Sequence, residues 1–454
     1  MKSDLSRDTF DGAKHFTRVL MQQGRVTLDA DHNEQVAILL HYLWTLAADV
    51  IGPAGGPVDG GGFHLGAPPD ATSSFSIGKG RYYVDGLLVE NNQDGLYAQQ
   101  ADFSLPADDP FQPNAPRPKG PLVAYLDVWE RHVTPVEDAA IREVALGGPD
   151  TCNRAKLVWQ VKLAPVPQAR STDRKATELA RRKTRTERAL AKETDEEARK
   201  KLQTELDAIN AEIAKAAAAG AAGADRAPAD CSAALDGIDR IGTGRLAARL
   251  DPGAVPPDPC VMPPDSRYRG AENQLYRVEV HQPGTVGVAT FKWSRDNGSV
   301  STTLLNLDGN DLVVARSRGF EAGNWVELSD ETLDLLGKPG TLVKLAKVEP
   351  GVLTVDPASA AGAGAFWGTH GKLPKVRRWD QVATGDIELV AGAVRIVGPT
   401  ADGLAQWIDL EDGIQVRFTA DGTYRTGDYW LIPARVATGT IEWPASTPAP
   451  DQSE

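Results

Sequence analysis

The sequence is poor in residues that cross-link small secreted folds or bind metals. Its three cysteines, Cys152, Cys231 and Cys260, form no C-x-x-C pair, which argues against a disulfide scaffold and against a thiol redox motif. None of its seven histidines has H-x-x-x-H or H-E-x-x-H spacing, so no helical metal pair is predicted. Cys231 and Cys260 flank a Gly/Pro-rich segment, and a disulfide between them and two buried free thiols remain alternatives.

Sequence motifs of catalysis are also missing. The chain has no G-x-S-x-G nucleophile elbow and neither of the glycine-rich patterns that surround phosphates, G-x-x-x-x-G-K-[ST] and G-x-G-x-x-G. We therefore expect no enzymatic activity and no cofactor. Catalytic carboxylate pairs need not be close in sequence, so a cell-envelope polysaccharide hydrolase stays an alternative.

Positive charge and long apolar runs are scarce as well. The formal net charge is −13, which argues against a general nucleic-acid binder because such a protein needs a basic face. No run of about 18 apolar residues exists, so no transmembrane segment is predicted. The first eight residues lack the apolar core of a signal peptide. We expect assembly in the cytoplasm, with release as part of an extracellular particle as a further step.

The sequence is rich in turn residues and short apolar segments. Its 44 glycines and 31 prolines favour a mainly β (α+β) fold with a sandwich or barrel-like body. Asp85-Gly86 and Asn297-Gly298 each predict a tight β-hairpin turn. The predicted parts are an arm and helix at 1–60, β-rich segments at 61–165 and 228–444, a helical hairpin at 166–227, and a disordered tail at 445–454.

Residues 20–37 contain the most informative local pattern. Gln22-Gln23-Gly24 predicts a turn, and Asp29 and Asp31 stand where side chains cap the first turn of a helix. The helix that follows has apolar residues at spacings of three and four, which predicts one buried face. These are Val36, Leu39, Leu40, Leu43, Leu46, Ala47 and Val50.

The same stretch begins like a calcium loop. Asp29, Asp31 and Asn33 follow the D-x-D-x-N start of such a loop. Glu34 then replaces the glycine that the sharp turn requires, and Leu40 replaces the bidentate glutamate. We therefore favour helix capping and predict no metal site, with these three residues as the alternative ligands.

Residues 171–219 differ in composition from the rest of the chain. They are rich in Ala, Glu, Lys and Arg, which predicts either one long helix or a hairpin of two helices. We favour the hairpin, because Thr194 and Glu197 fit a capping box that would begin a second helix. The second helix has a coiled-coil seam that we expect to contact a partner helix. Its residues are Leu202, Leu206, Ile209 and Ile213.

Several segments resemble an uncharacterised bacterial family of unknown function. The opening segments are 6–11 (SRDTFD) and 21–34 (MQQGRVTLDADHNE). Further segments are 83–86 (YVDG), 127–135 (DVWERHVTP), 272–281 (ENQLYRVEVH), 291–298 (FKWSRDNG) and 424–430 (YRTGDYW). The family is similar to proteins encoded with phage-tail-like contractile injection systems. That resemblance implies a baseplate, fibre or cage-like component.

The leading hypothesis is a structural subunit of such a particle. We expect a homo-oligomer that also contacts other particle subunits, with Gln22, Gln23, Gly24, Asp29 and Asp31 in the assembly region. A fibre module that binds surface glycans through exposed Trp and Tyr is the alternative hypothesis.

Overall fold

The structure is a computed structural model of the chain. It describes residues 1–68, 74–106, 108–112, 122–166, 196–220, 242–251, 267–359, 370–383, 387–399 and 406–443. It also describes the single residues 179, 182, 183, 186, 190 and 238. The chain forms two compact units. The first comprises Met1–Pro113, Val128–Gln160 and Ile241–Glu454, and the second comprises Asn114–Asp127 and Val161–Arg240.

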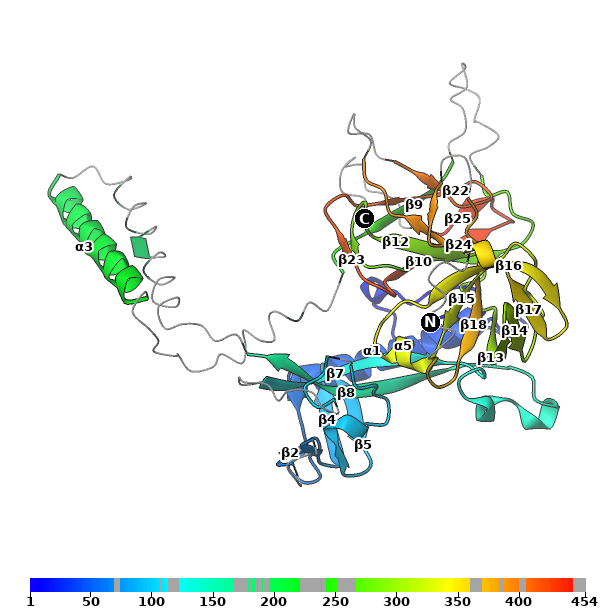
Figure 1. The fold of residues 1–454 in the computed structure, drawn as a ribbon, viewed down its shortest axis with the longest axis horizontal. Helices are drawn as coiled ribbons and strands as arrows, with labels where there is room; N and C mark the ends of the chain where they lie inside the picture. Colours follow the sequence, from blue (N-terminus) through cyan, green and yellow to red (C-terminus); the bar gives the residue numbers. More distant parts are fainter. Residues whose placement is uncertain are drawn as a thin grey trace, which may run out of the picture. The chain divides into compact units, whose positions relative to one another are not determined.

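A closed barrel forms one part of the first unit (Figure 1). Its strands follow the order β13–β14–β17–β16–β15–β18. In that order they span Ser301–Asp308, Asp311–Val314, Val352–Val355, Thr341–Glu349, Trp325–Ser329 and Lys375–Trp379. Alternate residues of each strand point inward, so Val326 and Leu328 of β15 share one core with Val343 and Leu345 of β16. This alternation provides the barrel with an apolar interior.

A β-sandwich forms a second part of the same unit. Its larger sheet has the order β19–β20–β12–β10–β24–β25, and its smaller sheet has the order β21–β22–β9. The larger sheet contains Leu389–Val390, Ala393–Arg395, Thr290–Ser294, Gln274–Val280, Tyr429–Arg435 and Thr440–Ile441; the smaller contains Ile408–Asp409, Ile414–Phe418 and Leu246–Leu250. Tyr276 and Phe291 of the larger sheet and Phe418 of the smaller belong to one buried core. The mainly β prediction is confirmed, and the body contains both a sandwich and a barrel.

Short sheets and helical turns form further parts of the first unit. One sheet contains β1 (Ala54–Gly55), β4 (Gly80–Val84) and β5 (Leu87–Asn91), a second contains β2 (Leu65–Gly66), β3 (Ser76–Ile77) and β6 (Gly95–Leu96), and a third contains β11 (Gly284–Thr285) and β23 (Thr423–Tyr424). The short helix is α5 (Glu331–Leu335). The 3-10 turns are η1 (Gly12–Lys14), η2 (Tyr97–Gln99), η3 (Ala139–Ile141), η4 (Val144–Leu146) and η5 (Pro357–Ser359). Asp85 and Gly86 join β4 to β5 with φ angles of 46° and 82°. The first predicted hairpin turn is therefore confirmed.

The second predicted hairpin is wrong. Asn297 and Gly298 do have positive φ angles, 56° and 63°. However, β12 before them pairs with β10 and β20, whereas β13 after them pairs with β14 and β18. The tight turn therefore passes the chain from the sandwich to the barrel, because each flanking strand finds its partners in a different sheet.

The second unit contains the predicted helical insertion. A two-stranded sheet of β7 (Leu122–Val133) and β8 (Arg154–Pro165) precedes it in sequence, and its main helix is α3 (Glu196–Gly220). Nη1 of Arg182 lies 3.9 Å from Oε2 of Glu212. Residues 30 positions apart in one straight helix would be about 45 Å apart, so Arg182 and Glu212 do not belong to one straight helix. No helix in the described part of the chain is long and apolar enough to cross a membrane.

Candidate functional site

The central strand of the large sheet has one apolar face and one charged face. Tyr276, Val278 and Val280 of β10 point into the sandwich core. The alternating residues Arg277 and Glu279 are also buried, with exposed fractions of 3% and 2%. Because strand side chains alternate between faces, the charged residues lie on the face opposite the sandwich core. This face binds the first residues of the N-terminal arm, which comprises residues 1–28.

Lys2 of the arm enters a buried ionic cluster on this face. Its Nζ lies 2.9 Å from Oε1 of Glu279, which also lies 3.3 Å from Nζ of Lys292. Lys292 in turn lies 2.5 Å from Oε1 of Glu327, and the other Glu327 oxygen accepts a 2.9 Å hydrogen bond from Nε1 of Trp379. The cluster thus connects β10 and β12 of the sandwich to β15 and β18 of the barrel.

The pKa values in this cluster reflect burial and the neighbouring charges. Burial by itself would raise the pKa of Glu327, but Lys292 and Lys2 lower it to about 2. Burial likewise opposes the ionisation of Glu279, and Lys2, Arg277 and Lys292 hold the pKa of this carboxyl well below its usual range. Both glutamates are therefore ionised at neutral pH. Burial lowers the pKa of Lys2 to about 8.

The backbone of the arm is bound by Asn297, which lies within the turn between sandwich and barrel. Its Nδ2 donates hydrogen bonds to the carbonyl oxygens of Met1 at 3.0 Å and Ser3 at 2.8 Å. The amide of Lys2 donates to Nδ1 of His132, on β7, at 3.3 Å. Asn297 is fully buried. An unpaired amide at such a position would be costly, so the arm completes the buried structure around this turn.

The next part of the arm binds the first helix, α1 (Asp29–Ile51). The carboxylate of Asp29 accepts hydrogen bonds from the amide and hydroxyl of Ser6 at 2.9 and 2.6 Å. Thr9 donates through Oγ1 to Glu34 at 2.5 Å. Burial by itself would raise the pKa of Asp29, but these hydrogen bonds from Ser6 lower it below its ordinary value. The expectation that Asp29 or Asp31 caps the helix is wrong: Leu28 is the N-cap and makes no side-chain hydrogen bond to the helix.

The weak metal candidates and the predicted turn lie nearby. Asp31 is half-buried within the first helical turn, and Asn33 is exposed. Gln22, Gln23 and Gly24 do form a turn, in which the Arg25 amide donates to the carbonyl oxygen of Gln22 at 3.4 Å and Gly24 has a φ of 71°. Their assignment to an assembly region stays a prediction.

The predicted buried face of α1 is largely exposed. The buried residues of the helix are Ala30 and Ile38, and its other side contacts β1, β4 and β5. The prediction is wrong because the hairpin of β4 and β5 contacts the face around Trp44, where Gly86 approaches the Trp44 backbone closely. An apolar stripe remains uncovered. Its members are Val36, Leu39, Leu43, Leu46 and Val50, which are 43% to 75% exposed.

The arm adds two exposed apolar side chains close in sequence to its contact with α1. The amide of Val19 donates a 2.9 Å hydrogen bond to Oε1 of Gln35, the residue before the first stripe position. Leu20 and Met21 follow with exposed fractions of 69% and 59%. We refer to the five α1 residues together with Leu20 and Met21 as the apolar seam. Exposed apolar side chains that gather in this way typically mark an interaction surface.

The predicted seam of the insertion faces inward on α3. Ile209 is 1% exposed, and Leu202, Leu206 and Ile213 are half-buried. Most of the preceding helical segment lies outside the described residues, so contact with a partner helix stays a prediction. Cys231, Cys260 and the tail from 444 onward also lie outside the described residues. Cys152 is exposed and free.

Sequence reasoning missed the ionic cluster and the role of Asn297. The signal was present, since Arg277, Glu279 and Lys292 interrupt otherwise apolar strands at alternating positions. Such alternation commonly indicates a solvent-facing side of a sheet. Here the barrel and the arm cover that side, and no local pattern reveals a cover supplied by residues nearly 300 positions away.

The fold and site define a mainly β protein with a barrel, a sandwich and an N-terminal arm bound at their junction. The chain belongs to a family of unknown function, DUF6519, whose model matches residues 1–454. No curated protein matches it significantly. Among solved structures it has 9% identity to a chain described as the crystal structure of TssK, covering 90% of this chain and 99% of that chain. The TM-score is 0.13, which supports no conclusion about fold or function.

Proposed function

We propose that this protein is a non-enzymatic structural subunit that assembles through the apolar seam. The supporting observation is the exposed stripe on α1, a helix of 23 residues whose opposite side contacts its own chain. Each exposed leucine leaves apolar surface in water at a cost of about 25 cal/mol per Å². A partner that covers the seam would recover that free energy.

The proposed occupant is α1 of a second copy of this chain. The stripe residues alternate at steps of three and four, which is the repeat of a two-heptad coiled-coil seam. The six flanking positions carry a single charge, on Asp49, so identical helices meet little like-charge repulsion. They are Asn33, Gln35, Leu40, Tyr42, Ala47 and Asp49. A symmetric contact between copies is therefore compatible with the sequence of the helix.

The bound arm gives this helix a fixed position. Met1 and Ser3 are held by Asn297, and Ser6 is held by Asp29 at the start of α1. Because the arm is bound at both points, it connects the barrel–sandwich junction to the helix. Assembly contacts made by α1 would thus be transmitted to the β body. The buried charges of the junction are occupied in these structural contacts, which supports a non-enzymatic role.

The more specific part of the proposal is a component of a phage-tail-like contractile injection particle. The support is the sequence resemblance of residues 6–11 and 21–34, the segments that form the arm and the start of α1. In this proposal the seam joins copies of the chain, and the helical insertion contacts a second subunit.

The seam is tested by measuring the oligomeric state of the full-length protein by light scattering. Leu39→Glu combined with Leu46→Glu should convert an oligomer into a monomer with an unchanged melting temperature, because both side chains are exposed. The matched control is Leu305→Glu on the barrel, since Leu305 is 62% exposed and Leu46 is 61% exposed. A wild-type protein that is monomeric at about 100 µM would overturn the self-association.

The particle is tested separately. Contractile particles isolated from the native cell should contain this chain by mass spectrometry, and the Leu39 and Leu46 variant should be missing from them. A wild-type chain that is never found in such particles would refute the particle assignment while leaving the seam result unaffected.

A further inference from the structure

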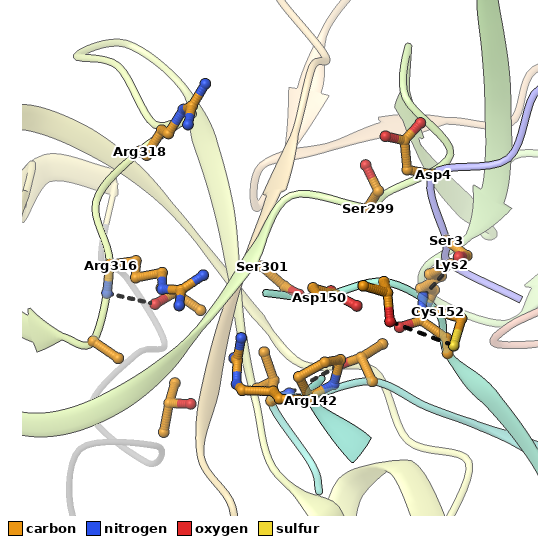
Figure 2. Close-up of a pocket in the computed structure, with 18 residues that line it drawn as sticks. Lys2, Ser3, Asp4, Arg142, Asp150, Cys152, Ser299, Ser301, Arg316 and Arg318 are labelled. Carbon is orange, nitrogen blue, oxygen red and sulfur yellow. Dashed lines mark hydrogen bonds between the residues drawn. The ribbon is translucent and has the colours of Figure 1, made fainter. Parts of the chain in front are cut away.

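A polar pocket opens beside the arm in the first unit. Its volume is about 620 Å³, and residues of the arm, of the segment between β7 and β8, and of the barrel line it (Figure 2). Lys2, Ser3 and Asp4 come from the arm, and Asp150 and Cys152 come from the segment between the strands. Figure 2 shows Asp4 and Cys152 on one side of the view and Arg316 and Arg318 on the other.

Three arginines make the pocket unusual. Arg142 lies between β7 and β8, and Arg316 and Arg318 follow β14. Within the described part of the chain, no carboxylate lies within 4.0 Å of these three guanidinium groups. Arg142 reaches only the carbonyl oxygen of Gly148, at 3.5 Å. In a chain of net charge −13, three guanidinium groups without carboxylate partners line one cavity, and guanidinium is the side-chain group best suited to bind an oxyanion.

The rest of the lining is suited to hydroxyl groups. Seven hydroxyl side chains contribute donors and acceptors, and Asp4 and Asp150 contribute acceptors. The hydroxyl residues are Ser3, Thr134, Thr151, Ser299, Ser301, Thr302 and Thr303. The described lining includes no aromatic residue, so the pocket does not match the expected glycan surface of exposed Trp and Tyr.

We propose that this pocket binds a small phosphorylated sugar, with the phosphate at the arginines and the sugar hydroxyls at the aspartates. Guanidinium groups bind phosphate oxygens through paired, charge-assisted hydrogen bonds, and carboxylates accept hydrogen bonds from hydroxyl groups. The cavity volume falls in the range of small-molecule sites, about 300–1,000 Å³. This inference is independent of the assembly role, although both involve the arm.

Cys152 supplies a reporter inside the pocket. Its Sγ accepts a 3.0 Å hydrogen bond from Nη1 of Arg154, and this bond, with that of Thr151, lowers the pKa of the thiol. A thiol with a lowered pKa and an exposed side chain reacts readily with alkylating reagents. A bound phosphosugar would shield Cys152 sterically and, through its negative charge, disfavour the thiolate.

The test measures the alkylation rate of Cys152 in the full-length protein by peptide-resolved mass spectrometry, with glucose 6-phosphate, glucose or inorganic phosphate present. We expect glucose 6-phosphate to slow alkylation at least tenfold and at lower concentration than either fragment. No protection at 10 mM glucose 6-phosphate would overturn the site. Equal protection by inorganic phosphate would overturn the sugar part of the proposal.

Variants identify the residues responsible. Arg316→Gln combined with Arg318→Gln should weaken protection at least tenfold, because each removed guanidinium loses charge-assisted hydrogen bonds to the phosphate. Both side chains are exposed, so the fold should be retained. Arg81→Gln, at an exposed position outside the pocket, is the matched control. Protection that survives in the double variant would show that the arginines do not bind the phosphate.

Discussion

Lys292 and Glu327 form a buried ion pair between the sandwich and the barrel. Their closest atoms, Nζ and Oε1, lie 2.5 Å apart, and the two side chains are only 3% and 7% exposed. Lys292 also lies over the ring of Trp379, 4.4 Å from its centroid. The two β substructures are thus joined by a buried ionic contact, and removing one partner of such a pair is strongly destabilising.

The first prediction concerns this pair. Glu327→Gln should lower the free energy of unfolding by about 3–5 kcal/mol, because Lys292 and Lys2 lose a buried counter-charge. Urea denaturation of the full chain measures the change. The control is Glu349→Gln, which removes an ion pair of two exposed residues with Lys347 and should cost about 1 kcal/mol or less. Equal losses for the two variants would contradict the role of the buried pair.

The second prediction concerns acid stability. Burial, followed by the charge of Lys292, lowers the pKa of His281 to about 4 from its usual 6.5. Between these values the unfolded chain binds a proton that the folded chain does not, so stability should decrease as the pH falls from 6.5 to 4. Glu327, whose pKa is about 2, should add a further loss as the pH falls below its ordinary value of 4.5.

Urea midpoints between pH 7.5 and 5 test the histidine contribution. His281→Gln should reduce the decline by about 2 kcal/mol, because about 1.5 pH units of this window lie between the unfolded and folded pKa values of His281. Exposed His370→Gln should keep the wild-type profile. An unchanged profile in the His281 variant would assign the acid sensitivity to other groups. His132 is the first to consider, since burial and then Arg377 lower its pKa to about 3.

The third prediction concerns the arm. Asp29→Ala removes the acceptor of both Ser6 hydrogen bonds, so backbone amides around Ser6 should exchange hydrogen at least tenfold faster. The global unfolding free energy should fall by about 1 kcal/mol or less, because these contacts are exposed. Asp49→Ala, at an exposed position of the same helix, should leave the exchange unchanged. The same exchange rate in both variants would mean that Asp29 does not hold the arm.

The fourth prediction concerns the contact of α1 with the β4–β5 hairpin. Gly86 has a φ of 82°, and a Cβ there would overlap the backbone carbonyl of Trp44. Gly86→Ala should therefore destabilise the protein by about 2–4 kcal/mol, through backbone strain and a steric clash. Gly24→Ala is a matched control, with a φ of 71° and no atom within 4 Å of its Cβ. Thermal unfolding should show a clearly larger loss for the Gly86 variant.

The fifth prediction concerns the insertion. Ile209 is 1% exposed on α3, so Ile209→Glu should place a charge at a buried position and loosen the helix. Hydrogen exchange across 196–220 should accelerate by tenfold or more, while exchange in the barrel stays unchanged. Ala208→Glu, at the neighbouring exposed position, should have little effect. Similar acceleration in both variants would indicate that the helix has no protected side.

Local sequence patterns predicted the turns and strands themselves better than they predicted which strands pair with each other. Asp85-Gly86 produced the expected hairpin because both flanking strands find their partner in each other. Asn297-Gly298 has the same turn conformation, yet its flanking strands pair in different sheets. Turn chemistry fixes the backbone of the turn residues, whereas strand pairing depends on hydrogen-bond partners far along the chain.

The helix at 29–51 shows a second kind of limit. Its periodic apolar residues correctly predicted the helix, but periodicity cannot distinguish a face buried within one chain from a face that awaits a partner. Similarly, the Asp29 side chain was predicted to cap the first turn of the helix because the cap rule considers only neighbours in sequence. Its hydrogen-bond partner is Ser6, 23 residues earlier.

The binding of the arm by Asn297 has a consequence for the order of events during synthesis. Asn297 follows Met1 by 296 residues, which a ribosome adds in about 15–60 s. During that interval the first residues have no binding site, because Asn297, Lys292 and Glu327 have not yet been made. We therefore expect the arm to bind late, so that α1 gains its final anchor only on chains that already extend past Asn297 and Glu327.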